Sequence, residues 1–303
     1  MPISRLIRFI PRALSSTSSS SSALPSLARA APLIGEPVDP ELDVGLATYS
    51  NQDVEVDVYS GTSVLAPGSK TGKREMVGRL LSPLAREEVG TIRCIGLNYH
   101  RHASEMDMSP PPLPTLFLKP STALGDPYPA PTILPKAFEQ DNAADYEAEL
   151  VVVIGKDCKN VGEEEAMDYV LGYTAANDVS SRLAQFAQSQ WCFSKGFDGA
   201  CPLGPALVMR DQVELGKMEI RAELNGETVQ ESGINDLIFG VPKIVSFLSQ
   251  GTTLPAGTII LTGTPAGVGW SSKPRKTLQD GDEYRVWVSG GVGTLINKIE
   301  QEV

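Results

Sequence analysis

The stretch Asp145-Tyr-Glu-Ala-Glu-Leu-Val-Val-Val-Ile-Gly155 is the most strand-like run of the chain, and the rest of the sequence is interpreted outward from it. Its second half, Leu150 to Ile154, is apolar without interruption, which is typical of a strand buried on both faces. Because successive strand side chains point to opposite faces, Glu147 and Glu149 point the same way, with their backbones roughly 7 Å apart. Two like charges at the edge of a core require a cation or buried donors. For this motif alone, a solvated strand end is the alternative.

The composition sets bounds on the class of protein. The chain has 303 residues, of which 41% are hydrophobic and 21% charged, as in an ordinary globular enzyme. This length allows one large domain, or a small domain joined to a large one. The net charge of -11 argues against nucleic-acid binding. No apolar stretch approaches the roughly 18 residues that a membrane span needs, so we expect no membrane partner.

The cysteines and histidines argue against structural disulfides and zinc. Cys94, Cys158, Cys192 and Cys201 form no Cys-x-x-Cys pair, and we expect reduced thiols in an intracellular protein. The chain holds only two histidines, so a zinc site of the Cys/His type is not expected.

The N-terminal segment permits two interpretations. Residues 1–35 contain four arginines and no acidic residue, with a serine-rich run from Ser15 to Ser22, and this composition fits a mitochondrial transit peptide. In the other interpretation, Arg5 to Ile10 form a first β-strand, and the serine-rich insert at residues 11–32 is disordered. We adopt the second interpretation, which predicts a cytoplasmic protein.

Alternating and apolar runs predict a β-rich chain. Short alternating runs within residues 41–85, such as Val54 to Tyr59, indicate a small β-rich N-terminal region, so we divide the chain into residues 1–88 and 89–303. Further strands are predicted over 91–96, 115–119, 172–177, 220–224, 227–230 and 258–262. Helices are predicted over 163–170, 180–189 and 238–248.

Polar residues of matching chemistry follow several of these strands. Asp178 closes one predicted strand, as Glu147 and Glu149 open another. Three carboxylates with room for waters suit a hard cation with oxygen ligands, most simply Mg²⁺, with Mn²⁺ or Ca²⁺ as alternatives. Lys195 would provide a fixed positive charge beside the metal, where a substrate oxygen acquires negative charge.

Other polar pairs suggest catalysis and substrate binding. In a helical turn, Glu105 can orient the imidazole of His102 and raise its basicity. Arg182 and Gln185 have the same i,i+3 spacing and could clamp a substrate carboxylate. A solvated surface is the alternative for each pair taken alone. The glycine-rich turn around Thr264 lacks the lysine of a P-loop, so we expect its hydroxyl and amides to face a small carboxylate rather than a nucleotide.

Six ordered motifs, from about residue 90 to the end of the chain, resemble the fumarylacetoacetate hydrolase superfamily. They are Gly96-Leu-Asn-Tyr with His102 and Glu105, Leu116-Phe-Leu-Lys-Pro120, Tyr146-Glu-Ala-Glu-Leu, Gly172-Tyr to Asn177-Asp178-Val-Ser, Ser194-Lys-Gly-Phe-Asp198 and Thr262-Gly-Thr-Pro-Ala-Gly-Val-Gly269. The resemblance implies a β-rich α+β fold. This is a mixed β-sheet roll with short flanking helices, preceded by a small N-terminal β unit and often found in a homodimer.

The resemblance also implies roles for particular residues. The implied metal ligands are Glu147, Glu149 and Asp178, with Lys195 beside them. The catalytic pair of the family falls on His102 and Glu105, in a segment that orders as a lid over bound substrate. Positions that contact the 2-oxo acid substrate fall on Lys119, Arg182, Gln185 and Thr264.

The implied activity is metal-dependent hydrolysis of a carbon–carbon bond in a small enolisable 2-oxo acid, in the acylpyruvate or fumarylacetoacetate manner. Cys201 to Val208 and Arg5 to Phe9 resemble the eukaryotic fumarylacetoacetate hydrolase domain-containing protein 2 branch, which is linked to keto–enol tautomerisation of oxaloacetate. Tautomerisation or decarboxylation of oxaloacetate is therefore the alternative, and a non-catalytic metal-binding protein is an alternative from another class. We place hydrolysis first, because His102 and Glu105 complete a water-activating pair.

Overall fold

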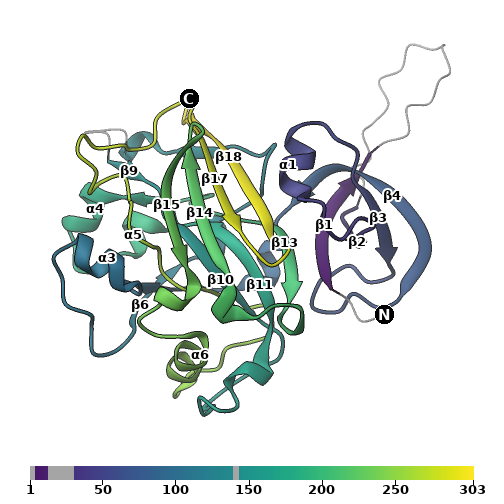
Figure 1. The fold of residues 1–303 in the computed structure, drawn as a ribbon, viewed down its shortest axis with the longest axis horizontal. Helices are drawn as coiled ribbons and strands as arrows, with labels where there is room; N and C mark the ends of the chain where they lie inside the picture. The colour runs from purple at the N-terminus through teal and green to yellow at the C-terminus, as the bar shows by residue number, and fades with distance from the viewer. Residues whose placement is uncertain (1–3, 13–30, 139–142) are drawn as a thin grey trace.

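The computed structural model describes residues 4–12, 31–138 and 143–303, and the described chain is rich in β-strands (Figure 1). The strands of the largest sheet are β1 (Arg5–Pro11), β2 (Leu33–Pro37), β3 (Glu55–Tyr59), β4 (Lys70–Leu81), β5 (Ile92–Gly96), β6 (Thr115–Lys119), β7 (Leu124–Gly125), β10 (Ala148–Ile154), β11 (Val170–Asn177), β13 (Cys201–Met209) and β16 (Ile259–Leu261). They run in the order β2-β3-β4-β1-β13-β11-β10-β16-β5-β6, with β7 beside β13.

A second sheet packs on the middle of the first, against β10, β11 and β13. Its strands are β8 (Thr132–Leu134), β14 (Glu219–Leu224), β15 (Glu227–Gly233), β17 (Glu283–Val288) and β18 (Gly293–Gln301), in the order β15-β14-β17-β18-β8. A short ladder joins β9 (Ala144–Asp145) to β12 (Ser180–Ser181). Two packed sheets with short helices confirm the predicted β-rich α+β fold.

The described helices are short and lie at strand ends (Figure 1). The α-helices are α1 (Val44–Tyr49), α2 (Arg86–Val89), α3 (His100–Glu105), α4 (Arg182–Phe186), α5 (Cys192–Lys195) and α6 (Val241–Ser249). The 3₁₀ turns are η1 (Ser121–Ala123), η2 (Lys136–Phe138), η4 (Ala166–Tyr169), η5 (Arg210–Gln212), η6 (Leu215–Lys217) and η7 (Ile234–Asp236). Across the described ranges, no helix has both the length and the apolar character needed to span a membrane.

Strand β10 lies at the centre of the core, as its sequence predicts. Leu150 to Ile154 are fully buried, because β11 and β16 flank the strand and the second sheet covers one face. The predicted strands over 91–96, 115–119, 172–177, 220–224, 227–230 and 258–262 are also confirmed within a few residues.

The pairing of these strands brings the polar residues together at one end of the strands. Because β10 and β11 are antiparallel, the start of one meets the end of the other, and the Asp178 amide donates to the Glu147 carbonyl at 2.9 Å. Strand β16 is also antiparallel to β10, and the Thr262 amide donates to the Leu150 carbonyl at 3.1 Å. Strand β5 runs parallel to β16, so helix α3, which follows β5, lies at the same end of the strands.

The N-terminal strand is confirmed as part of the fold. In β1, Leu6, Ile7 and Phe9 are fully buried, and the strand pairs with β2 and β4. It also pairs with β13 of the central sheet, where Leu6 lies opposite Leu207. Many of the apolar residues of β1 to β4 form a cluster separate from the main core, although the boundary between residues 88 and 89 stays a prediction. The run from Ser15 to Ser22 lies outside the described residues.

Two predicted helices are wrong or shorter than expected. Residues 163–170 form a turn and the 3₁₀ segment η4 instead of an α-helix, because Val170 already pairs with Ile154 as the first residue of β11. Within 180–189 only Arg182–Phe186 is helical, since Ser180 and Ser181 pair with β9. A helix this short gains little from its own hydrogen bonds, so tertiary pairing decides its limits. Helix α6 carries the predicted apolar face but begins only at Val241.

Candidate active site

Three carboxylates from neighbouring strands meet in the interior. Glu147 lies just before β10, Glu149 lies within it, and Asp178 follows β11. One oxygen of each lies within 4.8 Å of the others, and all three side chains are buried. The structure therefore brings together the three residues predicted as metal ligands, and all of the donor atoms are oxygens, which hard divalent cations prefer.

Lys195, at the end of α5, bridges two of these carboxylates. Its Nζ donates to Glu147 Oε2 and Asp178 Oδ2, both at 2.8 Å. Burial opposes the charge on Lys195, but the nearby Asp178 and Glu147 outweigh this effect and raise its pKa. Lys195 is therefore a fixed cation at the edge of the carboxylate cluster.

Lys119 lies behind the carboxylates. Its side chain is fully buried, and its Nζ donates to Asp178 Oδ1 at 2.5 Å and to the Ala200 carbonyl at 2.7 Å. It does not line the cavity next to the cluster. The geometry gives Lys119 a part in holding Asp178, whereas its contact with substrate stays a prediction.

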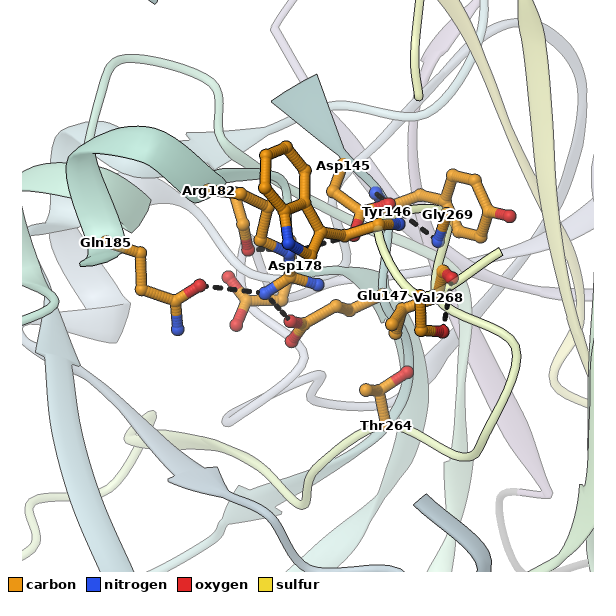
Figure 2. A network of polar contacts seen from close by, with 12 residues as sticks. Asp145, Tyr146, Glu147, Asp178, Arg182, Gln185, Thr264, Val268 and Gly269 are labelled. Carbon is orange, nitrogen blue, oxygen red and sulfur yellow. Dashed lines mark hydrogen bonds and ion pairs between the residues drawn. The ribbon is translucent and has the colours of Figure 1, made fainter. Parts of the chain in front are cut away.

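Arg182, the first residue of α4, ties the cluster to a fourth carboxylate. Its guanidinium donates to Asp145 at 2.8 Å, to Glu147 at 2.7 Å and to the side-chain Oε1 of Gln185 at 2.9 Å (Figure 2). Because Arg182 is 6% exposed, the solvated-helix alternative is wrong for it. Sequence reasoning missed Asp145, which also accepts the Gly269 amide. Its spacing of two from Glu147 was the signal, since both side chains share one strand face.

The charges differ between the two glutamates. Burial opposes ionisation of Glu147, but Lys195 and Arg182 outweigh it and lower its pKa to about 2. For Glu149, burial and the charges of Asp178 and Glu147 all act in one direction and raise its pKa well above the ordinary value. The negative charge of Glu147 is thus balanced by Arg182 and Lys195, whereas the surroundings of Glu149 oppose its ionisation.

Glu149 has no ion-pair partner among the described residues. The contact it makes is with the Gly263 amide, which donates to Oε2 at 2.5 Å. Four buried carboxylates, counting Asp145, therefore face three buried cations, Lys119, Arg182 and Lys195. The raised pKa favours the protonated form of Glu149, and a bound cation would favour the ionised form instead. The buried, all-oxygen donor set therefore fits a divalent metal ion.

His102 and Glu105 form the predicted pair on α3. The His102 Nδ1 lies 2.9 Å from Glu105 Oε2, while Glu105 Oε1 accepts the Gly267 amide at 2.9 Å and the Ser271 hydroxyl at 2.8 Å. Burial opposes ionisation of Glu105, but these three donors outweigh it and lower its pKa. An ionised carboxylate only accepts, so Nδ1 carries the proton and Nε2 remains free to act as a base.

Gln230 sets the direction of the Thr264 hydroxyl, a role that sequence reasoning missed. Gln230 Oε1 accepts the Ala148 amide and the Tyr284 hydroxyl, at 3.0 and 2.7 Å. Its Nε2 donates to the Pro265 carbonyl and to Thr264 Oγ1, both at 2.8 Å. The Ala148 amide can only donate and the Pro265 carbonyl can only accept, which fixes the orientation of the Gln230 side chain. The Thr264 hydroxyl thus accepts from Gln230 and keeps its own hydrogen for another acceptor.

Six of the ten predicted site residues line one cavity of ≈ 160 Å³, whereas Glu105, Lys119, Glu149 and Asp178 do not. Those that line it are His102, Glu147, Arg182, Gln185, Lys195 and Thr264. The expectation that amides of the glycine-rich turn face a substrate was wrong at two positions, because the Gly263 and Gly267 amides donate to Glu149 and Glu105. Those amides instead hold a carboxylate of the cluster and helix α3 in place.

Comparison with known proteins gives a consistent assignment. The family model for the fumarylacetoacetate (FAA) hydrolase C-terminal region matches residues 91–300. The chain is 45% identical over 273 residues to caffeoylpyruvate hydrolase of Neonothopanus nambi, covering 89% of each chain. It is 39% identical over 221 residues to the mitochondrial oxaloacetate tautomerase Fahd2a of Rattus norvegicus, covering 72% of this chain and 68% of that one. The solved fumarylacetoacetate hydrolase of Exiguobacterium antarcticum matches with a TM-score of 0.78 and 27% identity, over 99% of this chain and 100% of that one.

Proposed function

Because the chain belongs to the fumarylacetoacetate hydrolase family, we propose that it hydrolyses a carbon–carbon bond of a small enolisable 2,4-dioxo acid, an acylpyruvate, with the help of a divalent cation. The observation that carries this proposal is the His102–Glu105 pair, whose imidazole lines the same cavity as Glu147 of the carboxylate cluster. The 45% identical relative named caffeoylpyruvate hydrolase supports the same reaction class.

The cation would be held by Glu147, Glu149 and Asp178, and we propose Mg²⁺, with Mn²⁺ or Ca²⁺ as alternatives. When bound there, it would supply Lewis-acid stabilisation of the negative charge that an enolate acquires. Lys195 adds a fixed positive charge at the same end of the cavity, already oriented by two carboxylates.

The remaining lining residues bind and orient the oxo acid. Arg182 and Gln185 face the cavity as one hydrogen-bonded unit, so they can hold a carboxylate in one position. The Thr264 hydroxyl, whose oxygen accepts from Gln230, donates to a substrate oxygen. We propose that these three residues fix the acid end of the substrate.

Water activation falls to His102. Its Nε2 takes a proton from water, and the resulting hydroxide attacks the carbonyl carbon at position 4. The bond between carbons 3 and 4 then breaks, its electron pair passing to the pyruvate fragment as an enolate. Carbon 3 of that fragment takes up a proton, so one acylpyruvate and one water give a carboxylic acid and pyruvate. Glu105 holds the neutral imidazole in the tautomer with Nε2 free, and its charge stabilises the imidazolium that forms when Nε2 takes the proton.

The alternative is oxaloacetate keto–enol tautomerisation, favoured by the 39% identical relative of that name. That reaction moves a proton at carbon 3 and needs no attacking water, so His102 or Lys195 alone could serve it. Decarboxylation of oxaloacetate would leave the same enolate and needs no nucleophile either. Hydrolysis is preferred because the His102–Glu105 pair is complete, and hydrolysis is the reaction of the three that needs a base to activate water.

The test is a substrate panel with purified protein and Mg²⁺, comprising acetylpyruvate, fumarylpyruvate and the enol form of oxaloacetate. We expect pyruvate and the matching carboxylic acid in equal amounts from an acylpyruvate. Rapid loss of the enol absorbance of oxaloacetate, without release of pyruvate from any acylpyruvate, would refute hydrolysis and establish the alternative.

We also propose a homodimer in the cytoplasm. Strand β6 is an outer strand of the large sheet, and its Leu116 and Leu118 are 45% and 40% exposed, which suits pairing with a second chain. Cleavage near Arg29, as in a transit peptide, would remove the paired strand β1. Light scattering that gives a monomer mass would contradict the first proposal. A mature N-terminus beyond Arg29 in mitochondria, where the rat relative is named to reside, would contradict the second.

A further inference from the structure

The cavity is charged at one end and apolar over most of its remaining wall. Its charged residues belong to the acidic network around Glu147. Four aromatic side chains also line it, namely Phe117, Phe186, Trp191 and Trp270. Met106 and Met108, which follow helix α3, add flexible apolar surface. A small oxo acid alone would leave this apolar wall facing water.

The aromatic side chains are held in place before any ligand binds. The rings of Phe186 and Trp270 lie 5.7 Å apart between centroids, inclined by 47°. Trp191 packs edge-on against Phe117 at 5.4 Å. Its indole also lies directly on Gly96, where an added Cβ would come within 2.6 Å of the ring. The position of Trp191 therefore depends on a glycine, and its ring forms a fixed wall of the cavity.

No described cation that lines the cavity is left for a second substrate carboxylate. Arg182 is bound to Asp145 and Glu147, and Lys195 is bound to Glu147 and Asp178. The Arg275 guanidinium stacks on the Trp270 ring, 3.6 Å from its centroid, but Arg275 does not line the cavity. A carboxylate at the far end of a substrate would lose hydration against apolar side chains without gaining a partner.

We propose that the site selects 2,4-dioxo acids whose acyl group carries an aromatic ring, and that Phe186, Trp191 and Trp270 hold that ring. This inference rests on the proposed function, since the oxo-acid end must bind at the carboxylate cluster for the acyl group to reach the aromatic wall. Aromatic pairs gain from offset or edge-to-face packing in addition to the burial of apolar area. Acyl groups with an aromatic ring should therefore be preferred to small or carboxylated ones.

The experiment compares kcat/KM for benzoylpyruvate, acetylpyruvate and fumarylpyruvate with Mg²⁺ present. We expect benzoylpyruvate to exceed each of the others by at least about tenfold, since even one buried methylene gives a factor of that size. In Phe186→Ala the ratio of benzoylpyruvate to acetylpyruvate should fall about tenfold.

Phe193→Ala is the matched control, because Phe193 and Phe186 are each 61% exposed, yet Phe193 packs on Phe138 and does not line the cavity. The control should leave the substrate ratio unchanged. A wild-type ratio near one, or equal effects of the two substitutions, would overturn the proposal. So would fumarylpyruvate as the best substrate together with a selective loss of that activity in Arg275→Gln.

A binding measurement separates this inference from the proposed function. If no acylpyruvate is hydrolysed, the proposed function fails, and calorimetry with the Mg²⁺-bound protein still compares benzoylpyruvate with acetylpyruvate. Binding of benzoylpyruvate at least about tenfold tighter, and lost in Phe186→Ala but kept in Phe193→Ala, would support the aromatic subsite. Equal binding of the two compounds would overturn it.

Discussion

Glu149 shows how far a single residue can be interpreted from sequence. The strand period places Glu147 and Glu149 on one face, and the structure gathers them with Asp178 within 4.8 Å. Sequence alone does not show that Glu147 is paired with two cations and Glu149 with none, because Arg182 and Lys195 come from helices that follow a different strand. The inequality between the two glutamates is a property of the folded site.

Gln230 is a residue whose role could not be predicted from the sequence. It lies in β15 of the second sheet, and its strand pattern does not distinguish it from any inward-facing polar residue. Its four hydrogen bonds become apparent only when the two sheets are packed together. Residues that act through another residue are therefore the ones that sequence reasoning missed here.

The catalytic pair gives the first prediction at this scale. His102→Ala removes the base, and Glu105→Gln keeps the shape but loses the charge that fixes the imidazole. Each should lower the turnover of an acylpyruvate by about 10²–10⁴-fold, the usual contribution of a positioned general base. KM should change little, because Arg182 and the carboxylate cluster still hold the acid end. Steady-state kinetics on acylpyruvate and enol-oxaloacetate checks this, and negligible losses on both would remove the pair from the mechanism.

The second prediction at this scale concerns the substitution Gln230→Glu. The carboxylate cannot donate, so the Thr264 hydroxyl would turn its hydrogen toward residue 230 and away from the substrate. KM should rise about three- to tenfold, the range for one lost hydrogen bond, with a smaller change in kcat. The assay should run below the melting temperature of the variant. In a Thr264→Val background the same substitution should add almost nothing, and an undiminished effect there would show that Gln230 does not act through Thr264.

At the scale of elements, strands were predicted more reliably than short helices. The predicted strands over 5–10, 150–154 and 258–262 all form, because burial of their apolar side chains stabilises them. The expected helix over 163–170 does not form, because its last residue, Val170, belongs to β11 and pairs with Ile154 of β10. Local helix signals a few residues long give way to pairing that is specified elsewhere in the chain.

The attachment of β1 gives a prediction of pH dependence. The Ser4 amide and hydroxyl donate to Glu36 Oε1 at 2.8 and 2.7 Å, and Lys70 lies 3.0 Å from Oε2. Burial opposes ionisation of Glu36, but these partners outweigh it and lower the pKa from 4.5 to about 2. The stabilisation is therefore complete above pH 4.5 and lost as the pH falls toward 2.

Glu36→Gln keeps the shape and removes the charge. At pH 7 it should lower the free energy of unfolding by about 1 kcal/mol, the difference between a charged and a neutral hydrogen bond. The difference from wild type should shrink as the pH is lowered from 5 to 3, measured by urea unfolding at each pH. A difference that stays constant over this range would contradict the assignment.

At the scale of the whole molecule, antiparallel pairing explains why residues far apart in the sequence meet. Because β10 is antiparallel to both β11 and β16, the segment before β10 and the segments after the other two strands lie at the same end of these strands. Because β5 is parallel to β16, helix α3, which carries the catalytic pair, lies at the same end. The family resemblance predicted that these residues lie together. The relative direction of the strands, which brings them together, cannot be deduced from any single motif.

The central claim is that the carboxylate cluster holds a divalent cation on which turnover depends, and its most direct test is the turnover of an acylpyruvate by metal-free protein before and after Mg²⁺ is added. We predict that chelation abolishes turnover and that Mg²⁺ or Mn²⁺ restores it, since the three carboxylates would hold the cation that stabilises the enolate. Glu149→Ala should remain folded by circular dichroism and should not recover with Mg²⁺. Full turnover by the metal-free protein would contradict the account.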